Sequence, residues 1–248
     1  AVALAPGVGL GLATPSRRWA IPATDPGTIL RSIHGDRGPR WVWWGRDAAA
    51  DPIARAGIPI DRCWDVSAVH RLLDGGWRAP LGLVWASLHE LDLDTLPQMG
   101  QLGLLDGAVD EGDRDQPLRP DGHLRPEWVD GGFRETPDRL AAWAALALEA
   151  MHVQERLLAR RTEPERAMAT ARSESAAELL CAEMTAHGLP VDEAEARRLI
   201  TEAAGERPSS MADEDARRAE RDDLVLRHLE PRRQVNLRNP AEVKAMLR

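Results

Sequence analysis

Residues 41–73, WVWWGRDAAADPIARAGIPIDRCWDVSAVHRLL, decide how the first part of the chain folds. With Arg40 they open on a short aromatic and β-branched run between turn residues, which is typical of a buried strand. A short helix over 49–57 and an extended stretch over 58–64 are expected to follow. Asp65 then suits the N-cap of a further helix, which a pair of glycines ends. Strands and helices that alternate at these intervals predict a sheet covered by helices, an α/β unit.

The next segments are expected to add one helix to this unit and then to form a loose connection. Pro80 is placed to open another helix, which its apolar residues predict to run to about Leu91. Between residues 97 and 132 the chain is rich in Gly, Pro and Asp and has no apolar period, so we expect a loose excursion or linker. Leu104 and Trp128 are the side chains suited to anchor this excursion to the folded body.

From Thr136 onward the pattern is helical throughout. Thr136 suits an N-cap and Pro137 the first helical position, and the apolar spacing predicts a long helix to about Arg161. Three more helices are expected: one over 174–188 with Leu179, Leu180 and Met184 facing inward, one capped by Asp192 and Glu195, and one begun at Ser210 and Asp213.

The stretch VNLRNPAEVKAMLR, 235–248, begins one further helix. Asn239 is a good N-cap, Pro240 suits the first helical position, and Glu242 sits where a capping-box partner returns to the cap amide. An isolated helix needs roughly 12 to 15 residues to form in water, which is more than remain here. Residue 1 is Ala and not Met. We therefore expect this chain to be part of a longer protein.

Composition narrows the class of protein. The 248 residues are enough for one large domain or two smaller ones, and two are expected. The formal net charge of −8 excludes a global basic field of the kind that marks many nucleic-acid-binding proteins, although a local basic stripe is sufficient for binding. The acidic stretches 106–116 and 212–223 are interpreted as solvated surface.

Cysteine use and hydropathy indicate the compartment. Cys63 and Cys181 form no metal-ligand pattern and predict no disulfide framework, which fits a reducing interior. No apolar run approaches the roughly 20 residues of a membrane span, and the N-terminal stretch lacks the layout of a signal peptide. We expect a cytoplasmic protein without a membrane partner. The nine Trp are expected to be core residues, above all Trp41, Trp43 and Trp44 in one strand.

Two stretches near the end of the sequence carry a pattern of their own. In 174–200 the pattern is formed by Met184, Gly188, Val191 and Asp192, and in 235–247 by Asn236, Leu237 and Pro240. These stretches resemble the start of the polymerase region in family A DNA polymerases, the DNA polymerase I type, where the second motif lies at the tip of the thumb. The sequence of these stretches is most similar to that of the high-GC bacterial subgroup called bifunctional 3′-5′ exonuclease/DNA polymerase.

The resemblance implies a division into domains. Members of this family carry an RNase H-like 3′-5′ exonuclease domain, a sheet with helices, before the thumb. The chain would then hold a degenerate exonuclease-like α/β domain over 1–161 and the all-α start of a polymerase thumb over 162–248. Residues 41–73 resemble the segment with the second exonuclease motif, and residues 141–157 resemble the helix with the third.

The carboxylates that such a nuclease needs are missing. The family's exonuclease uses two metal ions held by carboxylates. Its third motif includes a Tyr, and this chain has none; the resemblance puts Leu140 at that Tyr and Ala144 at the Asp that follows. It puts Ala49 at the Asp of the second motif, and residues 1–16 contain no Asp-x-Glu. We expect a structural module that catalyses nothing and holds no metal.

The thumb resemblance implies contacts to the DNA backbone, which such domains grip with amides, hydroxyls and basic side chains. The residues expected to make them are Arg232, Arg233, Asn236, Arg238, Asn239 and Lys244. The chain departs from the family's motif where its Ser is Asn239, its Lys is Ala241 and its Gln is Glu242, and these departures weaken the expected grip. An ordinary solvated helix entrance is the alternative interpretation.

Three hypotheses on function remain open. In the first, the full protein is a DNA-directed DNA polymerase of the bacterial cytoplasm and nucleoid, acting in replication or repair on primer-template DNA and deoxynucleoside triphosphates, with Mg²⁺ held beyond this chain. In the second, the chain is a non-catalytic DNA-binding or docking module. The third keeps an active 3′-5′ exonuclease, in which a shifted register recovers Asp47 or Asp51.

Overall fold

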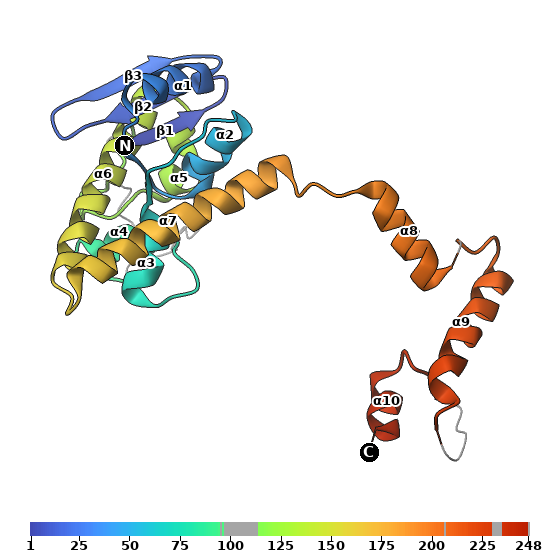
Figure 1. Cartoon of the computed structure of the whole chain (residues 1–248). Helices are drawn as coiled ribbons and strands as arrows, with labels where there is room; N and C mark the ends of the chain where they lie inside the picture. The colour runs from blue at the N-terminus through green and yellow to red at the C-terminus, as the bar shows by residue number, and fades with distance from the viewer. Residues whose placement is uncertain (95, 97–113, 206, 230–234, 248) are drawn as a thin grey trace. The chain divides into compact units, whose positions relative to one another are not determined.

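The computed structural model describes residues 1–94, 96, 114–205, 207–229 and 235–247, with the side chains of Arg37, Asp47 and Ala204 outside the description. Contacts divide the chain into two compact units, Ala1–Leu189 and Pro190–Arg248. The first unit contains the strands β1 (Val2–Ala5), β2 (Gly9–Ala13), β3 (Arg18–Pro22), β4 (Trp41–Trp43) and β5 (Cys63–Asp65) (Figure 1). Its helices are α1 (Pro26–Arg37), η1 (Arg46–Ala48), α2 (Ala50–Arg55), α3 (Val66–Asp74), α4 (Leu81–Leu88), α5 (Pro126–Val129), η2 (Gly132–Arg134), α6 (Pro137–Ala159) and α7 (Pro164–His187).

An antiparallel sheet of β1, β2 and β3 lies against the long helix α6 (Figure 1). Strand β2 is central, with Leu12 paired to Val2 on one side and to Trp19 on the other. Gly11 of β2 approaches α6 so closely that a Cβ atom there would overlap the backbone of Leu140. A residue without a side chain is therefore what allows the sheet and the helix to pack together.

A second, parallel pair of strands forms the centre of residues 41–73. Strands β4 and β5 pair with Trp43 opposite Asp65. Asp65 caps α3, because its carboxylate accepts a hydrogen bond from the Ala68 amide at 2.9 Å. The order of strand, helix, strand and helix predicted over 41–73 is confirmed. The unit is mixed α/β with two small sheets, and an RNase H-like topology stays a prediction.

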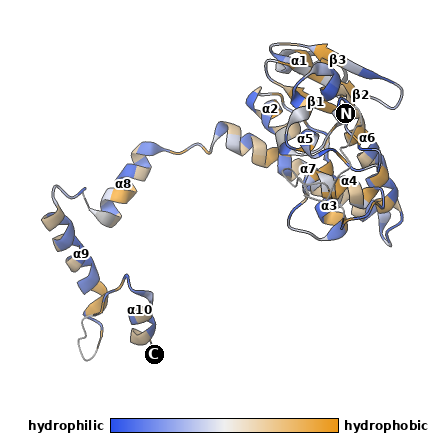
Figure 2. Ribbon diagram, turned by 180° about the vertical axis from the view of Figure 1, so that it is seen from behind, coloured by the Kyte–Doolittle hydropathy of each residue, from blue (hydrophilic) through white to orange (hydrophobic). Residues whose placement is uncertain are grey.

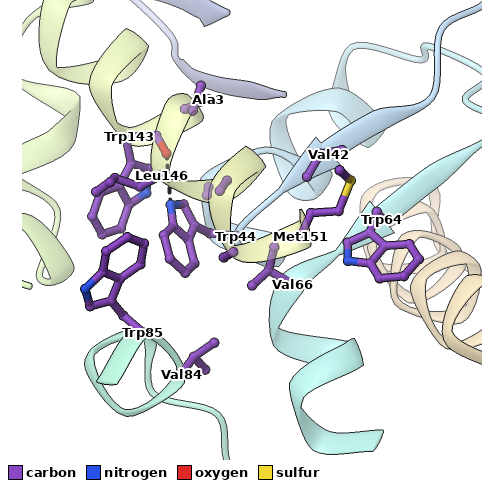
Figure 3. Packing of buried hydrophobic residues seen from close by; sticks show 14 of the residues in the cluster. Ala3, Val42, Trp44, Trp64, Val66, Val84, Trp85, Trp143, Leu146 and Met151 are labelled. Carbon is purple, nitrogen blue, oxygen red and sulfur yellow. Dashed lines mark hydrogen bonds between the residues drawn. The ribbon is translucent and has the colours of Figure 1, made fainter. Parts of the chain in front are cut away.

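Most of the Trp side chains lie in the core, as predicted from the sequence. Seven of the nine are buried, and Trp19 and Trp77 are the exposed exceptions. Figure 3 shows Trp44, Trp85 and Trp143 gathered together, with ring centroids 6.1 Å apart for Trp44–Trp85 and 5.2 Å for Trp44–Trp143. The indole nitrogen of Trp44 donates to the backbone carbonyl of Trp143 at 2.9 Å. This cluster joins the end of β4 to α4 and α6.

Helix α7 packs with the first unit, whereas the domain division implied by the resemblance assigned it to the thumb. It lies against α2, α3 and β5 (Figure 1). Ser175, Leu179 and Ala182 are buried along its length, so the helix contributes to the core of this unit. The boundary of the compact unit therefore falls at Leu189 rather than after residue 161.

The same helix differs from its prediction in length and in orientation. It begins at Pro164, a favourable first helical residue, and not near residue 174. Leu180 and Met184, predicted to face inward, are 55% and 43% exposed. The reason is geometric: only one face of α7 packs on the unit, and Leu179 occupies it.

Residues 114–132 are folded, which corrects the prediction of a loose excursion for this half of 97–132. An isolated β-bridge and the short helix α5 order the segment. Trp128 is buried in α5, and its indole nitrogen donates to a backbone carbonyl at 3.0 Å. This side chain therefore anchors the segment, as the sequence suggested. Leu104, the other suggested anchor, lies outside the described residues.

The second unit contains α8 (Glu193–Ala204), α9 (Met211–Leu226) and α10 (Pro240–Met246), and the caps predicted at Asp192, Ser210 and Asn239 are confirmed. Over its described residues no side chain is fully buried. Ion pairs along the helices, such as Arg198 with Glu202 at 2.7 Å, support them instead. Figure 2 shows apolar stretches on α8 and α9, where Leu199, Ile200 and Leu224 are exposed. In the described parts of both units, no helix has the length and apolar character needed to cross a membrane.

Candidate nucleic-acid interface

The positions where the resemblance would require a nuclease Tyr or Asp are apolar and buried. Ala49 lies between η1 and α2, and Leu140 and Ala144 lie near the start of α6, each with 0% of its surface exposed. Strand β1 presents only Val-Ala-Leu-Ala, all of it buried. Divalent cations of the hard type bind oxygen ligands, and these side chains supply none. The residues present therefore do not fit the metal pair that the resemblance implies.

Asp51 lies close to Ala49, where the resemblance would place an Asp, but its carboxylate is paired with an arginine. Its Oδ1 atom lies 3.2 Å from Nη2 of Arg46, and the same guanidinium reaches the Thr185 hydroxyl at 3.3 Å. Asp47 lies in η1, and its side chain is outside the described part of the structure. Among the described residues, no group of three or more His, Cys, Asp or Glu side chains could hold a metal ion. Among the side chains that the structure describes, Asp51 therefore stands in an ion pair and not in a carboxylate cluster.

Asp65 is the buried carboxylate of this region, and its bonds are structural. One oxygen accepts from the Trp43 indole at 2.9 Å and the other from the Ala68 amide at 2.9 Å, while the Asp65 amide donates to the Ser175 hydroxyl at 3.0 Å. Burial raises the pKa of Asp65 to about 6, although both hydrogen bonds act in the opposite direction. Each partner belongs to β4, α3 or α7, so this side chain holds elements together as an N-cap.

Three of the residues expected to contact DNA, Asn236, Arg238 and Asn239, lie in the turn before α10. Asn239 is the N-cap, and its Oδ1 accepts from the Ala241 amide at 3.1 Å. Glu242 does reach back, but to the Asn236 amide and to the Asn239 side-chain nitrogen, both at 2.8 Å. The Asn239 amide donates to the Asn236 carbonyl instead of to Glu242, which corrects the predicted capping box. Both polar atoms of the Asn239 side chain are therefore used within the turn.

The basic residues in and after this turn differ in whether their side chains are already paired. Arg238 forms a bidentate pair with Asp222 of α9, at 2.8 and 3.0 Å. The pair raises the pKa of the Arg238 guanidinium and lowers the pKa of the Asp222 carboxyl. Lys244 is exposed on α10 and has no bonded partner within the described residues. Arg232 and Arg233, also predicted to contact DNA, lie outside the described residues.

The structure also brings together basic residues for which the sequence alone predicted no role. Arg17 and Arg18 follow the turn between β2 and β3, and Arg156 lies on α6; the three side chains line one groove with His89 and His152. The sequence signal was the pair of adjacent arginines at a turn. Their meeting with a residue far along the chain could be found only from the packing of the hairpin on α6.

Comparison with protein-family models, with curated proteins and with solved structures finds no match to this chain. The polymerase resemblance therefore rests on the residues of 174–200 and 235–247 themselves. The fold and the site by themselves define only a general class of protein. The chain combines a mixed α/β unit with a helical unit that presents exposed basic side chains.

Proposed function

We propose that this chain is the N-terminal part of a DNA-directed DNA polymerase, in which a nuclease-like unit without metal ligands precedes helices that contact DNA. The main observation in support of the proposal is that residues of the resembling motifs stand at the ends and starts of helices. Gly188 ends α7 with a φ of 71°, Asp192 caps α8, and Pro240 is the first residue of α10. Three of the residues that carry the resemblance thus begin or end helices in this chain.

The first unit supports the structure without cutting DNA. Its strand and helix order accommodates the expected exonuclease-like domain, and Ala49, Leu140 and Ala144 fill the expected ligand positions with buried apolar atoms. A carboxylate placed at Leu140 or Ala144 would be desolvated among apolar neighbours, which is costly unless a metal compensates for it. The packing around α6 therefore favours a role as a scaffold.

The DNA contact is assigned to basic side chains on the second unit. Arg238 and Lys244 are exposed around α10, and Arg232 and Arg233 precede them in sequence. Guanidinium and ammonium groups bind backbone phosphates without reading base sequence. Asn236 adds a side-chain amide that lies on the surface. These groups suit the grip of a thumb on primer-template DNA, which is sequence-independent.

The catalytic steps belong to other parts of the proposed polymerase. The carboxylates for Mg²⁺, and the site for deoxynucleoside triphosphates, would lie in palm and fingers domains outside these residues. The proposed setting is the bacterial cytoplasm, at the nucleoid, in replication or repair.

The Asp222–Arg238 pair provides a sharp test of the DNA contact. If Arg238 binds phosphate, Asp222 competes for it, so the Asp222→Asn variant should bind duplex DNA more tightly than the wild type. The matched control is Asp215→Asn, which removes one exposed carboxylate from the same helix without touching Arg238. Arg238→Ala should weaken binding and lower the slope of log affinity against log salt by about one.

Fluorescence anisotropy of a labelled primer-template duplex, titrated with each protein at several salt concentrations, measures all three effects. Tighter binding by Asp222→Asn than by Asp215→Asn, together with the loss in Arg238→Ala, supports the assignment. Equal binding by the two carboxylate variants, with Arg238→Ala unchanged, rejects the placement of the contact at Arg238.

A non-catalytic docking module is the second candidate. Leu199 and Ile200 of α8 and Leu224 of α9 are exposed, and exposed apolar side chains on neighbouring helices suit a protein partner. A module that docks only to a protein predicts no salt-dependent duplex binding. The anisotropy titration therefore separates it from the DNA-contact proposal.

A further inference from the structure

A groove in the first unit lies between the turn that joins β2 to β3 and the outer face of α6, with the end of α4 at one side. We call it the hairpin groove. Its volume is about 690 Å³, within the range of a few hundred to about a thousand Å³ that holds small organic ligands. The groove is on a different face of α6 from Leu140 and Ala144, because Ala145, Leu148 and Glu149 turn outward while those two are buried.

The rim of the hairpin groove is basic. Arg17, Arg18 and Arg156 are exposed there, and none of the three guanidinium groups has a hydrogen-bond or ion-pair partner in the described part of the chain. Some other arginines of this unit are paired, as Arg40 is with Glu155 at 3.0 Å and Arg139 with Asp115 at 2.8 Å, whereas Arg55, Arg78 and Arg172 are unpaired among the described residues but do not lie together on one groove. The chain has a net charge of −8, so three unpaired guanidinium groups on one rim form a local positive patch. Such a patch favours the binding of an anion.

The acidic residue of the groove offsets only part of this charge. Glu149 is the one carboxylate among the described lining residues, and its Oε1 lies 3.2 Å from Nε2 of His89. His89 is held in place on its other side, because its Nδ1 lies 2.9 Å from the Trp85 carbonyl and its ring stacks on Trp85 with centroids 3.7 Å apart. The carboxylate is therefore oriented toward a fixed imidazole.

The floor and the turn complete a site for a ligand with both apolar and anionic parts. Leu88, Ala145, Leu148 and Val153 line the groove with apolar atoms. The turn is closed by Thr14, whose hydroxyl accepts from the Arg17 amide at 3.2 Å, so that the two adjacent arginines are presented from an ordered hairpin. Guanidinium groups bind phosphate oxygens with bidentate, charge-assisted hydrogen bonds.

We propose that the hairpin groove binds a phosphate ester of nucleotide size, with its phosphates on Arg17, Arg18 and Arg156 and its apolar part on the floor. The phosphate ester can belong to a free nucleotide or to a nucleic-acid backbone, since both present the same group. The proposal does not depend on the DNA contact assigned to the second unit, because none of its residues lies there.

Isothermal titration calorimetry on the whole chain tests the proposal with inorganic phosphate, adenosine triphosphate and a single-stranded thymidine pentanucleotide as separate probes. We expect saturable binding of at least one nucleotide probe, tighter than that of inorganic phosphate and weaker at higher salt. The triple variant Arg17→Gln, Arg18→Gln and Arg156→Gln should lower that affinity by about tenfold or more.

A control variant removes the same charge elsewhere. Arg55→Gln, Arg78→Gln and Arg172→Gln change three exposed arginines of the same unit that do not line the hairpin groove, and this variant should bind like the wild type. Preferential binding of the triphosphate identifies a free nucleotide, and preferential binding of the pentanucleotide identifies a nucleic-acid backbone. Absence of saturable binding by all three probes, or equal losses in both triple variants, overturns the proposal.

Discussion

Asp65 shows how a single side chain can serve three elements at the cost of pH sensitivity. Only 1% of its surface is exposed, and its oxygens are used by the Trp43 indole of β4 and the Ala68 amide of α3. Burial raises the pKa of this carboxyl from 3.8 to about 6. Between these two values the folded chain keeps a proton that the unfolded chain has released. The free energy of unfolding therefore falls as the pH rises through this window.

The Asp65→Asn variant isolates this effect, because Asn does not titrate and remains a good N-cap. The wild type should lose up to about 3 kcal/mol of stability relative to the variant between pH 4 and pH 7. Urea unfolding followed by circular dichroism at several pH values measures the difference between the two proteins. Exposed carboxylates contribute equally to both curves, so parallel pH dependences would contradict the assignment.

At the scale of elements, α7 is attached to the first unit by a buried hydrogen bond as well as by apolar contacts. The Ser175 hydroxyl accepts from the Asp65 amide at 3.0 Å and donates to the Ala171 carbonyl at 2.8 Å, and Ser175 is fully buried. A second tie runs through Gln154 of α6, which bonds the Trp64 indole at 2.9 Å and the Val66 carbonyl at 2.7 Å. These bonds align α6 and α7 with β5.

Removing the hydroxyl should expose how much α7 depends on this bond. Ser175→Ala leaves the buried Asp65 amide without its partner, and we expect a loss of about 1–3 kcal/mol in the free energy of unfolding. Ser173→Ala, on the exposed face of the same helix, is the matched control and should change stability little or raise it slightly. Urea unfolding of the two variants gives both values, and equal stabilities would show that α7 is not fixed through Ser175.

Elements with strong local signals were predictable from the sequence, and elements defined by packing were not. The caps Asp65, Asp192 and Asn239 stand where their residue types predicted, because a cap is a local hydrogen bond. Strands β1 and β2 went unassigned because small residues dominate them and both faces are covered, so no polar alternation marks them. The inward side of α7 depends on its neighbours, which the sequence does not list.

In the candidate sites, too, some features could be predicted from the sequence and others could not. Substitution of expected ligands by Ala49, Leu140 and Ala144 can be read directly from residue identities once the resemblance is drawn. The pairing of Arg238 with Asp222, and the meeting of Arg17 with Arg156, join residues far apart in the chain. Such contacts follow from the tertiary arrangement alone.

At the scale of the molecule, the two units should differ in resistance to proteolysis. The first unit has two apolar clusters, whereas no described residue of the second unit is fully buried, so its helices open more readily. Trypsin should therefore cut first after arginines of the second unit, such as Arg197, and leave a resistant product that contains α7. A time course analysed by mass spectrometry identifies the cuts. Early cleavage after Arg166 or Arg172 would instead place α7 with the second unit.

We propose that this chain grips DNA without cutting it. The most direct measurement incubates the whole chain with a 5′-labelled primer-template duplex and Mn²⁺, and resolves the complex on a native gel and the primer on a denaturing gel. We expect a retarded complex that disappears as salt rises, with the primer at full length. Absence of a complex would contradict the grip. A primer shortened in a Mn²⁺-dependent way, and left intact by the Asp47→Ala, Asp51→Ala double variant, would show that the nuclease is active.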